Sequence, residues 1–253
     1  MNAETITSRQ NPLMTHLRKL ASSRSYRKKS GEYLCDGTKL LAEALKWGAE
    51  VKTAVFSERV DIPLLPDGVR AVRVSEELMH SVSPMETPQG ALFTVALPEV
   101  QLPETLSGKH YLVLDGVQDP GNVGTILRTA DAFDCDGVFL VNACADLYNP
   151  KTARATMGAI FRREAYSVTE EELFALLRKS GVPLYGTALR DDTVPLAEAN
   201  LARAAVAIGS EGRGLSQQVL DECAKTLKIP MNPRCESLNA AIAATVVLWE
   251  MYR

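Results

Sequence analysis

The chain has 253 residues, of which 46% are hydrophobic and 23% charged, a composition typical of a globular protein and not of a disordered or fibrous one. The net charge is −3, but residues 1–30 carry seven lysines and arginines against one acid, so a basic N-terminal arm precedes an acidic body. The longest apolar stretch is too short to span a bilayer and the N-terminus lacks the apolar core of a signal peptide, so we expect a cytoplasmic protein.

Cysteine and histidine patterns predict no metal site. The five cysteines are scattered without a Cys-x-x-Cys pair, and the three histidines lie far apart. Idle thiols in a reducing compartment are the expected state.

The first 97 residues alternate between helix-like and strand-like segments. A helical spacing of leucines at the start is followed by the polar run SSRSYRKKSG. The pattern then predicts strands at 32–35, 51–56, 69–74 and 91–97, a helix at 39–47 ended by Gly48, and a short helix capped by Ser75.

Residues 98–108 hold two prolines and little periodicity and are predicted to link two domains, residues 1–97 and 109–253. In the second domain the patterns alternate again. They predict strands at 111–114, 137–141, 183–187, 204–208 and 226–229, and helices at 122–133, 152–157, 170–179, 215–221 and 238–252. This alternation favours an α/β fold with a mostly parallel sheet and helices on both faces.

The first segment with candidate functional residues runs from Leu114 to Phe133. A strand ends in Asp-Gly, a Pro-Gly turn follows, and a helix begins near Asn122, which places Arg128 in its second turn. Free amides at a helix N-terminus and a guanidinium together can hold a nucleotide phosphate. A plain cap and an arginine in a surface salt bridge explain the same residues equally well.

The second segment runs from Ala205 to Ser216, where an apolar strand leads into Gly209, Gly212 and Gly214. This spacing matches neither the dinucleotide fingerprint nor a Walker loop. Glycines allow a ligand to approach the backbone closely, although a tight turn without a ligand also needs them. Glu211 lies between them and is a candidate for orienting a ligand.

The third segment, Ile229 to Asn239, leads into the alanine-rich last helix. Ser237 is a good N-cap for that helix, and Asn239 then lies in its first turn. Capping explains Ser237 but not Asn239, since asparagine is a poor helix former.

In this order and spacing, the three segments resemble the three motifs of the SpoU/TrmH branch of the SPOUT methyltransferases. Arg154-x-Thr-x-Gly158 is similar to the family segment between motifs one and two. The N-terminal part resembles a substrate-binding domain related to ribosomal protein L30e. The matching pieces there are Asn-Pro at 11–12, Ser23-Arg24 with Arg27, Asp36-Gly37, and Thr87-Pro-Gln-Gly90.

The resemblance implies a trefoil knot in the C-terminal chain, S-adenosylmethionine as cofactor, and a homodimer packed through the last helix and the motif-one region. It also implies cofactor contacts from four residues, namely Thr187, Gly209, Ile229 and Leu238. The implied reaction is methylation of a ribose 2′-hydroxyl in structured RNA. Ribosomal RNA is favoured over transfer RNA because the two-domain layout resembles rRNA-modifying members.

The family's candidate for removing the hydroxyl proton is Arg128, but guanidinium has a pKa above about 12 and no lone pair. We therefore expect Arg128 to position RNA phosphate and stabilise the developing alkoxide. The implied catalytic set is completed by residues that order the loops and the ribose, namely Asn122, Glu211, Ser237 and Asn239.

The basic arm is expected to grip RNA phosphates through Arg24, Arg27, Lys28 and Lys29. A frayed, solubilising terminus is the alternative for this stretch. For the whole chain, a non-catalytic RNA-binding or ribosome-assembly factor with the same fold is the main alternative. A nucleotide-dependent oxidoreductase is a weaker one, because G-x-G-x-x-G is missing.

Overall fold

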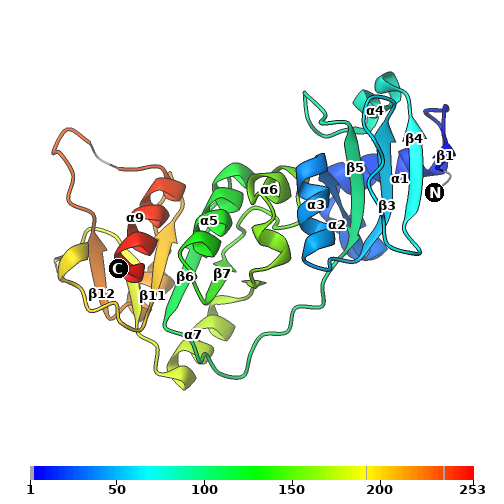
Figure 1. Cartoon of the computed structure of the whole chain (residues 1–253). Helices are drawn as coiled ribbons and strands as arrows, with labels where there is room; N and C mark the ends of the chain where they lie inside the picture. Colours follow the sequence, from blue (N-terminus) through cyan, green and yellow to red (C-terminus); the bar gives the residue numbers. More distant parts are fainter. Residues whose placement is uncertain (1–2, 192, 236) are drawn as a thin grey trace. The chain divides into compact units, whose positions relative to one another are not determined.

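The computed structural model describes residues 3–191, 193–235 and 237–253. The chain divides into two compact units (Figure 1). Unit 1 comprises Met1–Glu99 and Asp146–Arg162, and unit 2 comprises Val100–Ala145 and Arg163–Arg253. The segment predicted as a linker, residues 98–108, contains no helix or strand and carries the chain from unit 1 into unit 2. Residues 146–162 lie inside the predicted second domain, 109–253, but pack within unit 1, so that predicted domain is wrong for this segment.

Unit 1 contains a mixed five-stranded sheet. Its strands stand in the order β1 (Glu4–Thr5), β4 (Arg70–Val74), β3 (Val51–Ser57), β5 (Ala91–Ala96) and β2 (Glu32–Asp36). The β1–β4 and β3–β4 pairs are parallel, whereas β3–β5 and β2–β5 are antiparallel. Consequently strands run in both directions, and their carboxyl ends do not gather at one edge of this sheet.

Two cores cover the two faces of this sheet, because successive residues of a strand point to opposite faces. Leu34 of β2 lies in the core shared with α1 (Pro12–Ser22) and α4 (Glu76–Val82). Tyr33 and Cys35, its neighbours, lie in the core shared with α3 (Thr38–Lys46) and α6 (Pro150–Ala155). Segment 146–162 is therefore part of the second core of unit 1.

Unit 2 contains a seven-stranded sheet in which every described pairing is parallel. The order is β10 (Val194–Pro195), β12 (Lys225–Lys228), β9 (Leu184–Thr187), β11 (Ala204–Gly209), β6 (His110–Asp115), β7 (Gly137–Val141) and β8 (Ala165–Ser167). The predicted mostly parallel α/β sheet is confirmed. In a parallel sheet all carboxyl ends meet at one edge, where ligands bind.

Helices cover both faces of this sheet (Figure 1). On one face α5 (Pro120–Ala132) packs against α9 (Ala240–Tyr252). On the other face α7 (Glu170–Ser180) and α8 (Gln217–Glu222) contribute Leu173 and Val219 to a core with the sheet. Short 3-10 helices are also present at Leu196–Glu198 in unit 2 and at Ala159–Phe161 in unit 1. Among the described residues no helix has the length and apolar character needed to cross a membrane.

At α5 and α9 the N-cap is not the residue that the sequence suggests. Asp119 caps α5: its carboxylate accepts from the Asn122 amide at 2.8 Å, and Pro120 occupies the first turn. Asn122 therefore lies inside the helix and does not cap it. Asn239 caps α9, since its Oδ1 accepts from the amides of Ala241 and Ile242. Ser237 precedes that cap, so its predicted capping role is wrong.

A third difference is a helix that the apolar pattern missed. The polar run after α1 forms α2 (Arg24–Ser30), capped by the Ser23 hydroxyl and ended by Gly31 at φ 70°. Only Arg27 is buried in this helix. A helix with almost no apolar face leaves no periodic signal, although its serine cap and glycine stop are visible in the sequence.

Candidate active site

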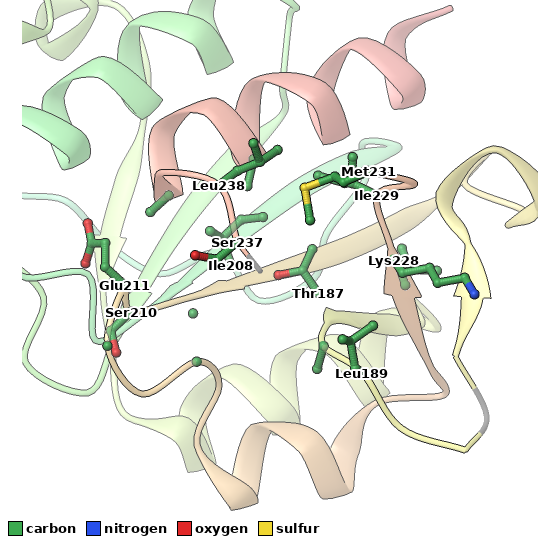
Figure 2. Close-up of a pocket in the computed structure, with 17 residues that line it drawn as sticks. Thr187, Leu189, Ile208, Ser210, Glu211, Lys228, Ile229, Met231, Ser237 and Leu238 are labelled. Atoms are coloured by element: carbon green, nitrogen blue, oxygen red, sulfur yellow. The ribbon is translucent and has the colours of Figure 1, made fainter. Parts of the chain in front are cut away.

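A pocket of about 320 Å³ opens at the carboxyl ends of three adjacent parallel strands, β12, β9 and β11. Its walls include the four residues predicted to contact the cofactor, namely Thr187, Gly209, Ile229 and Leu238. Most other walls are apolar, and Glu211 and Lys228 lie at opposite ends (Figure 2). The volume lies at the lower end of the roughly 300–1,000 Å³ typical of small-molecule sites.

The glycine-rich loop that forms one wall of the pocket closes on itself. The Ser210 amide donates to the Gly214 carbonyl at 3.1 Å, and the Gly214 amide donates back at 2.9 Å. A Cβ on Gly209 would lie 2.2 Å from the Gly214 carbonyl carbon, so no side chain fits there. Gly214 has φ 70°, a conformation that favours glycine. Gly212 meets no atom within 4 Å of an added Cβ, so its backbone position does not require glycine.

A polar cluster fastens the end of this loop to the sheet. The buried carboxylate of Asp115, the last residue of β6, accepts from the Ser216 amide at 2.6 Å and from Asn142 Nδ2 at 2.8 Å. Asn142 also donates to Glu170 at 2.6 Å, and the Ser216 hydroxyl donates to the same carboxylate at 2.9 Å. The cluster joins four distant parts of the sequence and fixes where the loop leaves the pocket.

The three sequence segments meet in a chain of side-chain hydrogen bonds. Asn239 Oδ1 is occupied by the first amides of α9, so its Nδ2 must donate, and it does so to Asn122 Oδ1 at 3.1 Å. Asn122 Nδ2 in turn donates to Glu211 Oε1. The α9 backbone therefore sets the orientation of the side-chain amides of Asn239 and Asn122. The last donor of this chain, Asn122 Nδ2, binds the Glu211 carboxylate at the pocket wall.

Ser237 lines the pocket, but Arg128 does not. Arg128 is exposed and forms no hydrogen bond or ion pair with any residue that the structure describes. Six residues separate it from Asn122, which is about 9 Å along the helix axis and a third of a turn around it. Within one chain, the structure brings together Asn122, Glu211, Ser237 and Asn239 and leaves Arg128 apart.

Two thiols near the ends of β6 and β7 are unsuited to nucleophilic chemistry. Burial raises the pKa of Cys144 to about 11 and that of Cys135 to about 11. Both remain protonated at neutral pH, and a thiol is a weak nucleophile. Across the described residues, no group of three or more His, Cys, Asp or Glu side chains could hold a metal ion.

Unit 1 separates the four predicted RNA contacts into two kinds. Arg27 is 3% exposed, its Nε and Nη2 donate to Asp146 at 3.1 and 2.6 Å, and its Nη1 donates to the Leu20 carbonyl. Its predicted phosphate contact is therefore wrong, since the side chain is buried and each of its three nitrogens donates inside the unit. Arg24 lies 3.8 Å from Asp146 but remains half exposed. Lys28 and Lys29 are exposed and available.

The site also contains residues that the sequence motifs do not predict. Asp115, Asn142 and Glu170 form the cluster under the loop, and Leu189 and Met231 add apolar walls to the pocket. One signal was present: Asp115 directly follows an apolar strand, the position at which α/β folds place ligand-facing groups. Asn142 has φ 53° after β7, which only the structure reveals.

Comparisons with known proteins agree with this geometry. Residues 109–249 match the SpoU rRNA Methylase family, and residues 11–92 match the MRM3-like substrate binding domain. A 23S rRNA (guanosine(2553)-2′-O)-methyltransferase from Bacillus subtilis is 34% identical, over 97% of this chain and 98% of its own length.

Two solved structures have the same fold over nearly the whole chain. An AdoMet-bound rRNA methyltransferase from Sinorhizobium meliloti has a TM-score of 0.87 and 28% identity, covering 98% of this chain and 97% of its own. The SpoU methyltransferase AviRb from Streptomyces viridochromogenes, in complex with AdoMet, has a TM-score of 0.85 and 25% identity, covering 96% and 97%.

Proposed function

Because this chain belongs to the SpoU rRNA methylase family, we propose that it transfers a methyl group from S-adenosylmethionine to a ribose 2′-hydroxyl of ribosomal RNA. The observation that carries the proposal is the hydrogen-bonded chain from Asn239 through Asn122 to Glu211, which ends on the wall of the pocket. It joins all three motif segments at the edge where a parallel sheet binds its ligand.

The pocket fits the cofactor in size and character. Apolar walls from Ile229, Met231 and Leu238 suit the adenosine, and the closely packed backbone at Gly209 provides main-chain partners. Glu211 supplies a negative charge at one end, where it favours the cationic sulfonium. When bound, S-adenosylmethionine would supply an electrophilic methyl group that the hydroxyl oxygen can attack, and its sulfur would leave as the neutral thioether.

The residues of the chain contribute mainly by alignment. Holding the hydroxyl in line with the methyl group can account for about 7–11 kcal/mol of the barrier. Asn122 and Asn239 have fixed orientations, so they order the ribose without paying for rearrangement during the reaction. Arg128 is suited to hold RNA phosphate and to stabilise developing negative charge, because guanidinium keeps its proton.

A homodimer completes this proposal, with α9 and α5 in the interface. α9 is apolar on all sides, with Glu250 as its one charged residue, and such helices are normally covered. Yet Ile242, Trp249 and Tyr252 are 52%, 53% and 57% exposed. A second copy packed on this face explains the exposed residues and carries Arg128 toward the pocket of its neighbour.

Two further features go with the proposed function. We propose that the C-terminal chain forms the family's trefoil knot; in support, β9 lies between β11 and β12, although both follow it in the chain. We also propose a cytoplasmic location, which the five free cysteines support.

The proposed function is tested with purified protein, labelled S-adenosylmethionine and separate pools of 23S rRNA, 16S rRNA and tRNA. We expect transfer to one rRNA pool, loss of transfer in Asn122→Ala, and normal transfer in Asn200→Ala, which alters an exposed asparagine elsewhere in unit 2. Transfer to tRNA alone would show that the substrate is tRNA and not rRNA. Absence of transfer to any pool, with cofactor binding intact, would favour a non-catalytic RNA-binding factor.

A further inference from the structure

Trp47 is a large aromatic side chain that unit 1 leaves half exposed. It is 49% exposed, although Leu45 and Ala49 on either side pack against a core. Among the described residues its ring contacts are with two cations: Lys46 Nζ and the Arg162 guanidinium carbon each lie 5.7 Å from the ring centroid. An exposed tryptophan with cations close to its ring offers a ligand both an aromatic surface and positive charge.

The backbone holds this ring in a defined place. Trp47 caps the C-terminus of α3, and its amide donates to the Glu43 carbonyl at 3.0 Å. Gly48 follows with φ 70°, and the Ala49 amide returns to the Ala44 carbonyl at 2.9 Å, which closes the helix end. Trp47 therefore belongs to a hydrogen-bonded helix C-terminus and not to an irregular loop.

One of the two cations is also fixed. Arg162 Nη1 donates to Glu43 Oε2 at 2.6 Å, and both residues contact Gly158. A Cβ on Gly158 would lie 2.9 Å from Arg162 Nη1 and 2.9 Å from Glu43 Cβ, so this glycine leaves the room that the pair needs. The glycine of the Arg-x-Thr-x-Gly segment thus supports the arginine beside Trp47.

Lys46 differs from Arg162 because it is exposed and has no carboxylate partner among the residues that the structure describes. Further free cations lie at the same edge of the sheet. α2 ends just before β2 and α3 ends just before β3, and the starts of these two strands both pair with the end of β5. Lys28 and Lys29 therefore share this edge with Lys46 and Trp47.

We propose that Trp47 is a stacking platform for an unpaired base of the RNA substrate, with Lys46 contacting the phosphate beside it. Aromatic faces bind splayed-out RNA bases without sequence preference, and neighbouring cations bind the backbone. The inference rests on the proposed function, since it names where the substrate RNA is held. It assigns Trp47 to RNA affinity and not to methyl transfer itself.

The test uses the full chain and two RNA probes of about ten nucleotides with equal charge, one normal and one abasic at every position, because single-strand sites span ~4–16 nucleotides. We expect the wild type to bind the normal probe roughly tenfold or more tightly than the abasic probe. Trp47→Leu loses this preference and keeps its affinity for the abasic probe. Trp47→Tyr retains most of it. Leu64→Ala, at a residue that is 93% exposed, behaves as the wild type.

A second readout does not depend on a stable leucine variant. The normal probe quenches tryptophan fluorescence in the wild type, and Trp47→Tyr removes that quenching although Trp249 remains. The proposal is overturned if the wild type shows no preference for bases, if Trp47→Leu keeps the preference, or if Trp47→Leu weakens both probes equally. Methyl transfer by the wild type to 23S rRNA, measured in parallel, separates failure of the platform from failure of the proposed function.

Discussion

The two units differ in whether the strands of their sheets run parallel, and this difference decides where the loops of each unit lie. In unit 2 every described strand pair is parallel, so the loops after β9, β11 and β12 converge on one pocket. In unit 1 the sheet is mixed, and no equivalent convergence arises. In unit 2 the loops therefore form one pocket, whereas the residues of unit 1 that we propose to bind RNA are spread over its surface.

Charged residues differ in whether their charge is paired within the chain. The arginines that link segment 146–162 to the rest of unit 1 are committed to partners: Arg27 to Asp146, Arg154 to Asp36 and Arg162 to Glu43. In unit 2, Glu211 and Arg128 remain exposed. A basic residue is therefore not an RNA contact by residue type alone, because it can be buried and paired with a carboxylate of the same chain.

The largest expected effect is on the stability of unit 1. Arg27→Ala removes the closer of the two arginines beside the Asp146 carboxylate, which is 15% exposed, and leaves only Arg24 at 3.8 Å, so it should lower the free energy of unfolding by about 3–5 kcal/mol. Arg70→Ala, which breaks a half-exposed pair with Glu4, should change it by less than ~1 kcal/mol. Urea denaturation measures both. If Arg27→Ala weakens RNA binding and leaves stability unchanged, Arg27 is a phosphate contact after all.

The next effect concerns Arg128 in unit 2. Arg128→Lys should reduce turnover by about 100- to 1,000-fold and leave cofactor affinity unchanged, because an ammonium cannot reproduce the two-pronged contact. Arg178→Lys, at an exposed arginine paired with Glu222, serves as the control. Near-normal turnover in Arg128→Lys, with RNA binding intact, would show that the fork-shaped contact has no role.

The same residue tests the proposed dimer. Arg128→Ala and Asn122→Ala are each expected to be inactive as homodimers. When the two variants are mixed under conditions that exchange subunits, one site of each mixed dimer regains both side chains, and activity returns. If Arg128 serves its own chain, mixing restores nothing.

A smaller effect is expected at the glycine loop. Gly209→Ala forces the loop open, because the new Cβ would lie 2.2 Å from the Gly214 carbonyl carbon, and cofactor affinity should fall by about tenfold or more. Gly212→Ala is the matched control, since its Cβ meets open space. Calorimetric titration with S-adenosylmethionine distinguishes them, and equal affinities in the two variants would contradict the role given to Gly209.

The smallest effect separates the two kinds of basic residue in unit 1. Replacing Lys28 and Lys29 by alanine should weaken RNA binding and reduce the slope of log affinity against log salt by about 0.7–0.9 for each lost phosphate contact. Stability and cofactor affinity should not change. An unaltered slope would remove both lysines from the RNA interface.

Much of the fold of unit 2 could be predicted from the sequence. Apolar strands alternate there with helical segments, and the 137–141 strand agrees with β7 at both ends. Helix starts were harder, because Asp119, Asn122, Ser237 and Asn239 are all acceptable caps by residue type. Only the structure shows which of these side chains accepts hydrogen bonds from the first backbone amides of each helix.

The candidate site was predictable where chemistry restricts the residue type. From the sequence, the glycine turn does not explain Glu211, and a cap at Ser237 does not explain Asn239. The structure joins both residues to Asn122 and makes Asn239 itself the cap. Contacts between distant segments leave no local pattern, so the Asp115 cluster and the pairing of Arg27 with Asp146 could not be predicted. The same limit applies to Trp47, whose exposure depends on how the helix end packs.

The most direct test of the central claim is a map of alkaline cleavage along the rRNA after incubation with protein and S-adenosylmethionine. A 2′-O-methyl group removes the nucleophile that cleaves the backbone. We therefore predict one new position of resistance, which disappears with Asn122→Ala and persists with Asn200→Ala. Incorporated methyl groups with an unchanged cleavage ladder would place the modification on a base and contradict ribose methylation by this site.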